Sequence, residues 1–347
     1  MGDLIARLAL LAPATAVVVL DRLGAADADV LFVLAALTLI PIAWLMGEAT
    51  DQAGHHVGPG IGGFLNASFG NAPELIVALV AISHGLPDVV RASLVGSVVG
   101  NLLLVLGFAL LAGPRGEIDR ASASVSLGVV FLAALLVLVP SAFALSGSPD
   151  RHSLAELSVP FAVALLSARV VINLRLLRRH RRLREIAEPG ESTRWSLPVA
   201  LGVLAVATLI TAFVTDTLVS SIEAFAKQAH LSTFFVAAVL VAFVGNAVEH
   251  GSAVLLAARG QIKLATEIAL ASSAQVAGFL IPVVALLSWA IDPLALAFRP
   301  IEIATMVGAA AVAGTVLARG RSSRVGGVVL VSAYLAVAAA FYLAGDR

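Results

Sequence analysis

Two segments of this sequence place an asparagine and a glutamate at the same spacing inside long apolar stretches. Residues 70–74 read Gly-Asn-Ala-Pro-Glu, and residues 245–249 read Gly-Asn-Ala-Val-Glu. Residues three apart on a helix share a face, so each segment would present one amide and one carboxylate on the same side. Gly70 and Gly245 would let neighbouring backbones approach closely.

If the two segments meet in the fold, their side chains form one set of oxygen ligands: Asn71, Glu74, Asn246 and Glu249. Pro73 would add a free backbone carbonyl near Glu74, because its ring clashes with the carbonyl four residues earlier. The chain contains no cysteine, which excludes thiolate metal sites and disulfides. Oxygen ligands suit Ca²⁺ better than Zn²⁺ or Cu²⁺. Protons would compete with such a cation for the same carboxylates.

The composition of the chain around these residues is typical of a membrane protein. Of its 347 residues, 60% are hydrophobic and 13% are charged, and the mean hydropathy is +1.00. Soluble domains carry about 25% charged residues, so the charges are too few to cover soluble surfaces. The apolar segments are long and continuous, which favours helices over the alternating strands of a membrane barrel. A net charge of zero argues against nucleic acid as a partner. The sequence also contains no Gly-Lys-Ser/Thr motif of the kind that binds a nucleotide.

A membrane-crossing helix needs about 20 mostly apolar residues, and eleven segments approach that length. The predicted spans are residues 5–20, 30–48, 62–84, 92–112, 123–145, 155–174, 197–218, 232–258, 264–290, 300–318 and 325–344. The first is the weakest, because its apolar stretch is short and contains Pro13; a cleaved signal peptide is the alternative.

Within their spans, a charge on Glu74 or Glu249 would cost at least about 2.5–3.5 kcal/mol, which marks both as functional. The alternative role for them is hydrogen bonding in helix association.

The positions of lysine and arginine predict the orientation. With the N-terminus inside, fourteen of these residues fall in inside loops and six lie outside, as the positive-inside rule requires. Residues 177–195 form a basic cytoplasmic linker, which we interpret as a topology anchor. Binding of anionic lipid is the alternative for this linker.

The linker divides the chain into two related halves. Residues 1–28 would form an N-terminal transmembrane helix, residues 29–176 a first repeat and residues 196–347 a second repeat. Five spans in each half give the halves opposite orientations, and inverted-repeat transporters place their ion site where the repeats meet. We therefore predict an all-α polytopic membrane protein of about eleven transmembrane helices, with two inverted five-helix repeats plus an N-terminal helix.

Further polar residues are weaker candidates. A shell supporting the glutamates is predicted from residues that recur in the two halves, although small polar residues also serve in helix packing: Ser97, Asn101, Ser272, Ser273 and Gln275. A secondary ion pathway is predicted from acidic residues that would lie near span ends, with solvated helix ends as the alternative: Glu48, Asp51, Asp216 and Glu223. His250 follows Glu249, and histidine changes charge near neutrality. We assign His250 to proton coupling or gating, with a hydrogen-bonded structural histidine as the alternative.

The two motifs, at residues 70–75 and 245–250, resemble the signature repeats of the calcium/proton exchangers, a family within the calcium:cation antiporter superfamily. Residues 47–51 (Gly-Glu-Ala-Thr-Asp) and the segment beginning at residues 96–101 (Gly-Ser-Val-Val-Gly-Asn) also resemble that family. The similarity covers about residues 30–345. It implies eleven helices in two inverted repeats and exchange of Ca²⁺ for H⁺.

The resemblance also implies roles for individual residues. Glu74 and Glu249 match the ion-coordinating glutamates, Asn71 and Asn246 match the flanking amides, and His250 matches a histidine that follows the second glutamate. The sodium/calcium branch carries Thr-Ser where this chain has Asn-Ala in both motifs, which favours H⁺ over Na⁺ as the counter-ion. The chain departs from the family in having shorter acidic residues at two positions, Asp51 and Asp216, and a basic linker where eukaryotic members have an acidic helix.

Together these features predict a secondary active Ca²⁺/H⁺ antiporter that works by alternating access, and not an enzyme. Its expected partners are the two transported ions and the lipid bilayer, with no further cofactor. Alternatives are a Na⁺/Ca²⁺ or other divalent cation exchanger, a passive channel, and an intramembrane enzyme with paired glutamates. Symmetric duplication argues against the enzyme, since an acid and a base need different environments. The predominance of Arg over Lys favours a prokaryotic plasma membrane.

Overall fold

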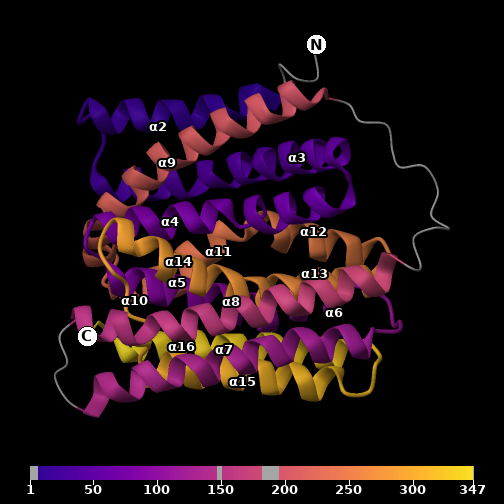
Figure 1. Cartoon of the computed structure of the whole chain (residues 1–347). Helices are drawn as coiled ribbons and strands as arrows, with labels where there is room; N and C mark the ends of the chain where they lie inside the picture. Colours follow the sequence, from indigo (N-terminus) through magenta and orange to yellow (C-terminus); the bar gives the residue numbers. More distant parts are fainter. Residues whose placement is uncertain (1–6, 147–150, 182–194, 347) are drawn as a thin grey trace.

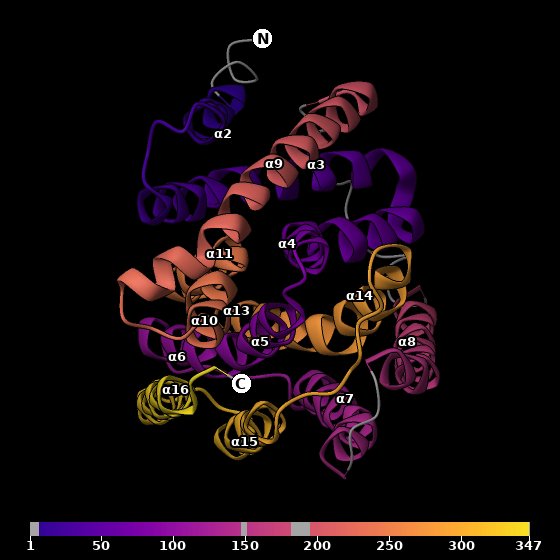
Figure 2. The ribbon, with the colours of Figure 1, turned by 90° about the vertical axis from the view of Figure 1, so that its left-hand side faces the viewer.

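The computed structural model of the chain is a bundle of helices, most of which run in a similar direction (Figure 1), while α3 (Ala28–Phe69) and α9 (Leu197–Gln228) are strongly tilted (Figure 2). It describes residues 7–146, 151–181 and 195–346. Most of the predicted basic linker, residues 177–195, therefore lies outside the described residues, and the linker stays a prediction.

In its described residues, the first half of the chain contains a short N-terminal helix, α2, and six further α-helices. They are α2 (Ala12–Arg22), α3 (Ala28–Phe69), α4 (Ala72–Ser83), α5 (Pro87–Val99), α6 (Leu106–Ala112), α7 (Arg120–Ser146) and α8 (Arg151–Arg181), with a 3₁₀ turn η1 (Ala9–Leu11) before α2. A π-helical segment, η2 (Gly100–Val105), joins α5 to α6 without a break in the chain direction.

The second half repeats this pattern with a different subdivision. Its helices are α9 (Leu197–Gln228), α10 (Thr233–Phe235), α11 (Ala242–Gly245), α12 (Ala247–Ala258), α13 (Ile262–Gln275), α14 (Ile281–Leu287), α15 (Pro300–Leu317) and α16 (Arg324–Ala344). The joining segments are two π-helical pieces, η4 (Val236–Val241) and η5 (Val276–Leu280), and the 3₁₀ turn η6 (Ser288–Ala290). η2 and η5 occupy corresponding places in the two halves, and π-helical turns are frequent at functional sites.

Eight helices in the described residues are long and apolar enough to cross a membrane, and the bent pair Thr233–Gly245 and Ala247–Ala258 makes up to nine. Two of the eleven predicted spans fall short of that length. The N-terminal helix α2 has only 11 residues, and the predicted span at residues 62–84 is interrupted before α4, which has 12. The all-helical membrane fold is confirmed, while the count of eleven stays a prediction.

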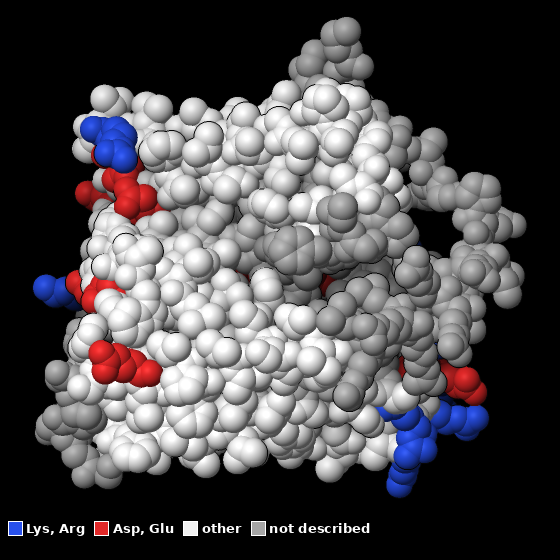
Figure 3. Space-filling view, in the orientation of Figure 1, with Lys and Arg blue, Asp and Glu red and all other residues white. Residues whose placement is uncertain are grey.

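On the face that Figure 3 shows, most charged side chains lie at the two ends of the bundle, and a broad band with few charges lies between them. Large apolar side chains are exposed within the spans, among them Leu135, Leu209 and Phe213. Such a surface is costly in water and favourable in a hydrocarbon layer. The chain is therefore an integral membrane protein.

The helices form three groups when the bundle is viewed end-on (Figure 2). α2, α3 and α9 lie on one side, and α3 packs most extensively against α9. α7, α15 and α16 lie on the opposite side, with α8 at the edge. Between them are α4, the α5–α6 span, the α10–α12 segment and the α13–α14 span, so these four central segments are the ones that can enclose a site.

The sequence predicted two spans, residues 30–48 and 62–84, with a loop between them, and the α3 helix replaces that loop. It is one helix from Ala28 to Phe69, and its ribbon curves back toward α4 (Figures 1 and 2). The interruption falls instead at Gly70 and Asn71, directly before the first motif. Glu48 and Asp51 lie within this helix, toward the end of its membrane-crossing part, Ala28–Val57, and their role in an ion pathway stays a prediction.

Gly96 marks the closest approach between the two halves. A Cβ atom built at this position would lie 1.9 Å from the carbonyl oxygen of Ala238, on η4. No real side chain fits at that distance, so α5 and η4 can pack this closely only because residue 96 has none. By contrast, a Cβ atom at Gly100, which is also buried, would meet nothing within 4 Å.

We expect Gly96→Ala to destabilise the protein, by about 1–3 kcal/mol or more, because the overpacked backbone must move apart. The matched control is Gly100→Ala on the same span. Thermal unfolding in detergent, followed by size-exclusion fluorescence, compares the two variants. Equal unfolding temperatures for both would contradict the close packing of α5 against η4.

Candidate cation-binding site

The two repeated motifs break their helices in the same way. Asn71 has backbone angles φ −111° and ψ 21°, and Asn246 has φ −98° and ψ 8°. Neither residue is helical, and each is the N-cap of the short helix that follows, α4 or α12. At the second break the helix axis bends by 59°. The sequence predicted each motif within an unbroken span, and this is wrong, because each asparagine lies at the break itself. That each asparagine shares a face with its glutamate stays a prediction.

Glu74 and Glu249 each occupy the first turn of the half-helix that begins at the break. The unpaired N–H groups and the dipole of a helix N-terminus favour a negative charge there. The second residue of α4 is Pro73, whose missing N–H costs nothing in a first turn. α4 and α12 run from the middle of the bundle toward opposite ends (Figure 1), so the two glutamates face one region from opposite directions.

The tertiary structure brings the two glutamates together. Glu74 Cγ lies 3.3 Å from the position that a Cβ atom would take on Gly245. Residue 245 therefore has to be small for Glu74 to lie against the break of the other half. Asn71, Glu74 and Asn246 are buried, and Glu249 is half-buried.

A chain of hydrogen bonds ties the second motif to the neighbouring spans. The Ser272 hydroxyl donates to Glu249 Oε2, and Asn101 Nδ2 donates to Ser272 Oγ at 2.9 Å and to Asn246 Oδ1 at 3.3 Å. Asn246 Nδ2 donates in turn to Ser97 Oγ at 2.8 Å. Three of the five residues predicted as a supporting shell thus contact the motif: Ser97, Asn101 and Ser272.

The first motif lacks such contacts among the described residues. Both polar atoms of the Asn71 amide and the Oε2 atom of Glu74 are buried there without a hydrogen-bond partner. Buried polar atoms without partners are costly, and a bound cation would supply the missing partner of the two oxygens. Asn246 Oδ1 keeps a second lone pair beyond its bond to Asn101.

The donor set is sparse, which suits a passing ion better than a tightly held one. Within the described ranges, no group of three or more His, Asp or Glu residues gathers as in a resident metal site. The set comprises two carboxylates and two amide oxygens. We therefore regard it as a candidate site for a cation that binds and leaves.

The remaining predicted residues lie outside this set. Ser273 bonds the carbonyl oxygens of Ala269 and Val98, and Gln275 is half-buried at the end of α13. His250 is buried, its ring lies 5.2 Å from that of Phe243, and neither ring nitrogen has a hydrogen-bond partner in the described part of the chain. The alternative of a hydrogen-bonded structural histidine is not what the structure describes.

The four acidic residues predicted as a pathway make contacts elsewhere or face solvent. Glu48 pairs with Arg7 at 2.8 Å, and Asp51 is exposed and pairs with His55. Asp216 pairs with His84, and Glu223 is exposed near the end of α9. His84 was not a candidate from the sequence, because 132 residues separate it from Asp216.

Comparisons with known proteins match nearly the whole chain. A family model described as sodium/calcium exchanger protein matches residues 29–176 and 199–343. A Ca²⁺/H⁺ antiporter of Synechocystis sp. is 32% identical over 335 residues, which cover 90% of each chain. The Ca²⁺/H⁺ antiporter ChaA of Bacillus subtilis is 35% identical over 325 residues, covering 90% of this chain and 92% of ChaA. The structure of native YfkE superposes with a TM-score of 0.80 at 31% identity, covering 97% of this chain and 99% of YfkE.

The hydrogen-bond chain around Asn101 predicts a measurable contribution to stability. Asn101→Ala removes the donor to Ser272 and Asn246, and we expect a loss of about 1–3 kcal/mol because buried partners stay unpaired. The matched control is Ser93→Ala on the same span, since Ser93 donates within its own helix, to Val90. Denaturant or thermal unfolding in detergent compares them, and an Asn101 variant as stable as the control would contradict the network.

Proposed function

Because this chain belongs to the sodium/calcium exchanger protein family, we propose that it is a secondary active antiporter that exchanges Ca²⁺ for H⁺ across a membrane. The observation that carries this proposal is the pair of glutamates, each in the first turn of a half-helix, that meet inside an apolar bundle. The names of the relatives, Ca²⁺/H⁺ antiporters of two bacteria, support the choice of ions.

In this proposal, Glu74 and Glu249 bind Ca²⁺ together with the amide oxygens of Asn71 and Asn246. Backbone carbonyls at the breaks complete the oxygen set, since helix interruptions leave carbonyls without intrahelical partners. The interruption of the helices and the close approach of the two motifs come from Gly70, Pro73 and Gly245. Ser97, Asn101 and Ser272 orient the second motif, and Ser273 and Gln275 belong to the same support.

Protons and Ca²⁺ exclude each other because they use the same oxygens. A protonated glutamate no longer offers a charged ligand, so the cation leaves, and a bound cation repels protons. Coupled exchange then follows if the loaded site opens alternately to the two sides. We assign His250, next to Glu249, to gating of this proton exchange.

The arrangement of the chain around the site follows from the same proposal. Residues 29–176 and 196–347 form two repeats of opposite orientation, residues 1–28 a helix outside them, and residues 177–195 a cytoplasmic linker. The two segments of the family match support this division. The bacterial relatives and the bias of basic residues support a prokaryotic plasma membrane, with the N-terminus cytoplasmic.

Replacing either carboxylate should abolish exchange. In proteoliposomes, we expect Glu74→Gln and Glu249→Gln to lose Ca²⁺ uptake driven by an imposed pH difference, because an amide holds no charge for the cation and no exchangeable proton. The matched control is Glu156→Gln, at an exposed position that pairs with His152. Normal uptake by both site variants would overturn the site, and uptake driven by a Na⁺ gradient would change the counter-ion.

Competition for the same oxygens also predicts the pH dependence of binding. The affinity for Ca²⁺ should fall as the pH falls from about 8 to about 6, because protonated ligands cannot bind a metal ion. Isothermal titration calorimetry of the purified protein in buffers of different ionisation enthalpy measures both the affinity and the protons released. A constant affinity with no proton release would contradict shared carboxylates.

A further inference from the structure

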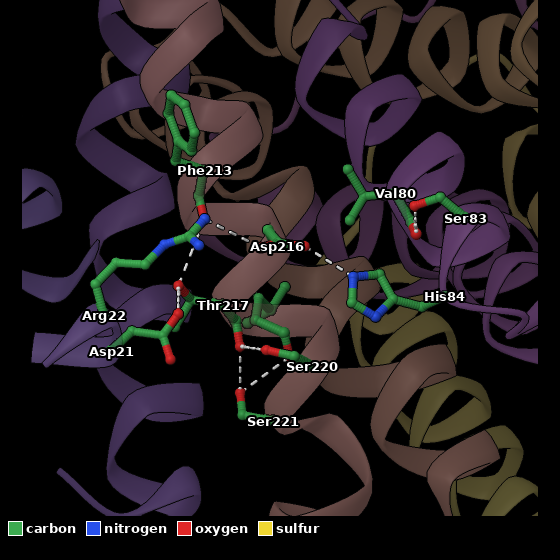
Figure 4. Close-up of polar contacts among 11 residues, drawn as sticks. Asp21, Arg22, Val80, Ser83, His84, Phe213, Asp216, Thr217, Ser220 and Ser221 are labelled. Atoms are coloured by element: carbon green, nitrogen blue, oxygen red, sulfur yellow. Dashed lines mark hydrogen bonds and ion pairs between the residues drawn. The ribbon is translucent and has the colours of Figure 1, made fainter. Parts of the chain in front are cut away.

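A cluster of charged and polar side chains joins three helices at the end of the bundle where α4 ends. His84 comes from the end of α4, Asp216 and Thr217 come from α9, and Asp21 and Arg22 come from the end of α2 (Figure 4). The basic-residue bias assigns this end to the outside of the membrane.

Adjacent residues of α9 are fastened in two directions. His84 Nε2 lies 2.8 Å from Asp216 Oδ1, so Asp216 ties α9 to α4. Thr217 Oγ1 donates to Asp21 Oδ2 at 2.7 Å, so Thr217 ties α9 to α2. Arg22 Nη2 lies 3.8 Å from the other oxygen of Asp216 and shares that carboxylate with His84 (Figure 4).

The tie to α4 reaches the candidate cation site through one short helix. Glu74 lies in the first turn of α4 and His84 is its C-cap. Ten residues separate them, which is about 15 Å along a helix. Asn71 is 1% and Glu74 7% exposed, whereas Glu249 is half-buried. For ions to reach Asn71 and Glu74 from the end of the bundle where α4 ends, an element packed on α4 has to move. α9 packs along α4, so its attachment bears on that opening.

His84 is placed to change this attachment with pH. Its side chain is 33% exposed and that of Asp216 is 44% exposed, so protons from the aqueous phase reach both. Histidine gains its charge between about pH 5 and 8, and a cation is favoured at a helix C-terminus. A hydrogen bond between charged partners is about twice as strong as a neutral one.

The other charged groups around α4 leave this assignment intact. On α5, Asp88 pairs with Arg91. On α3, Asp29 lies in the first turn. The segments α11 and α14, which also pack on α4, contain no charged residue. On α2, Arg22 competes for Asp216 but carries its charge at every pH in this range.

We propose that the His84–Asp216 pair is a proton-sensitive tie that must open before α9 parts from α4, and that its opening limits exchange when this face of the membrane is acidic. The observations behind it are the 2.8 Å contact of His84 Nε2 with Asp216 Oδ1 and the exposure of both side chains. Asp216 then acts as a structural partner and not as part of an ion pathway. This inference rests on the proposed exchange of Ca²⁺.

Exchange of Ca²⁺ for labelled Ca²⁺ isolates the tie from the driving force. With saturating Ca²⁺ on both sides, no net proton movement is needed, and competition at the glutamates is suppressed. We expect the wild-type rate to fall by about fivefold when the His84 face is acidified from about pH 8 to about pH 6. His84→Gln and Asp216→Asn should each keep the fast rate at both pH values.

A histidine–carboxylate pair elsewhere on the surface provides the matched control. His152 Nε2 lies 3.3 Å from Glu156 Oε1 on α8, and His152→Gln should retain the wild-type pH response. Loss of exchange in Asp216→Asn would identify Asp216 as part of the pathway and overturn the tie. Full wild-type pH dependence in His84→Gln would also overturn it. A wild-type protein that exchanges no Ca²⁺ would instead contradict the proposed function.

Cross-linking tests the same proposal without relying on the pH response. The chain has no cysteine, so a variant carrying both His84→Cys and Asp216→Cys has a single thiol pair. Joining the thiols with a short bifunctional maleimide should reduce exchange to background, while a monofunctional maleimide should not. Undiminished exchange in the fully cross-linked protein would show that α9 and α4 need not separate there.

Discussion

The rest of this structure depends on keeping two carboxylates inside an apolar bundle. Burying a charge without compensation is prohibitive, and the fold offers two kinds of compensation. Each glutamate begins a half-helix, where N–H groups and the helix dipole favour negative charge. Glu249 accepts a hydrogen bond from Ser272. The remaining unsatisfied oxygens, at Glu74 and Asn71, are the ones for which a proton or a cation would be the partner.

The two halves share a plan but differ in how firmly they hold their glutamate. Asn101 supports Ser272 and Asn246, whereas the residue 175 positions later, Val276, has no polar side chain to do so. Ser97 corresponds to Ser272, yet it accepts from Asn246 in the other half. The second motif is thus fixed by a chain of hydrogen bonds. In the first motif, buried polar atoms of Asn71 and Glu74 have no hydrogen-bond partner among the described residues. Such asymmetry suits a site in which one carboxylate stays in place and the other binds and releases the cation or the proton.

Polar contacts hold α9 just before its first residue and again past its middle. Near its first residues, Trp195 is held by His56 and by the ring contact with Arg7. Past the middle of the helix, Asp216 and Thr217 are held by α4 and α2. Apolar packing against α3 lies along the same helix. The release of Asp216 by His84 is then a local change in charge with consequences about 15 Å away, at the start of α4.

The sequence by itself determined the membrane class, the repeated motifs and the identity of the glutamates, because apolar length and charges inside apolar segments are local properties. The bias of Arg and Lys and the odd number of spans in each half also indicated that the two halves have opposite orientations in the membrane. Only the tertiary structure decided where the helices break. The apolar sequence continues across Gly70 and Asn71, so it predicts an unbroken span where the structure has an interruption. It also decided which polar residues meet: Ser97 contacts Asn246 and His84 contacts Asp216 across 149 and 132 residues. Such pairings depend on how distant segments pack, and no local pattern in the sequence records them.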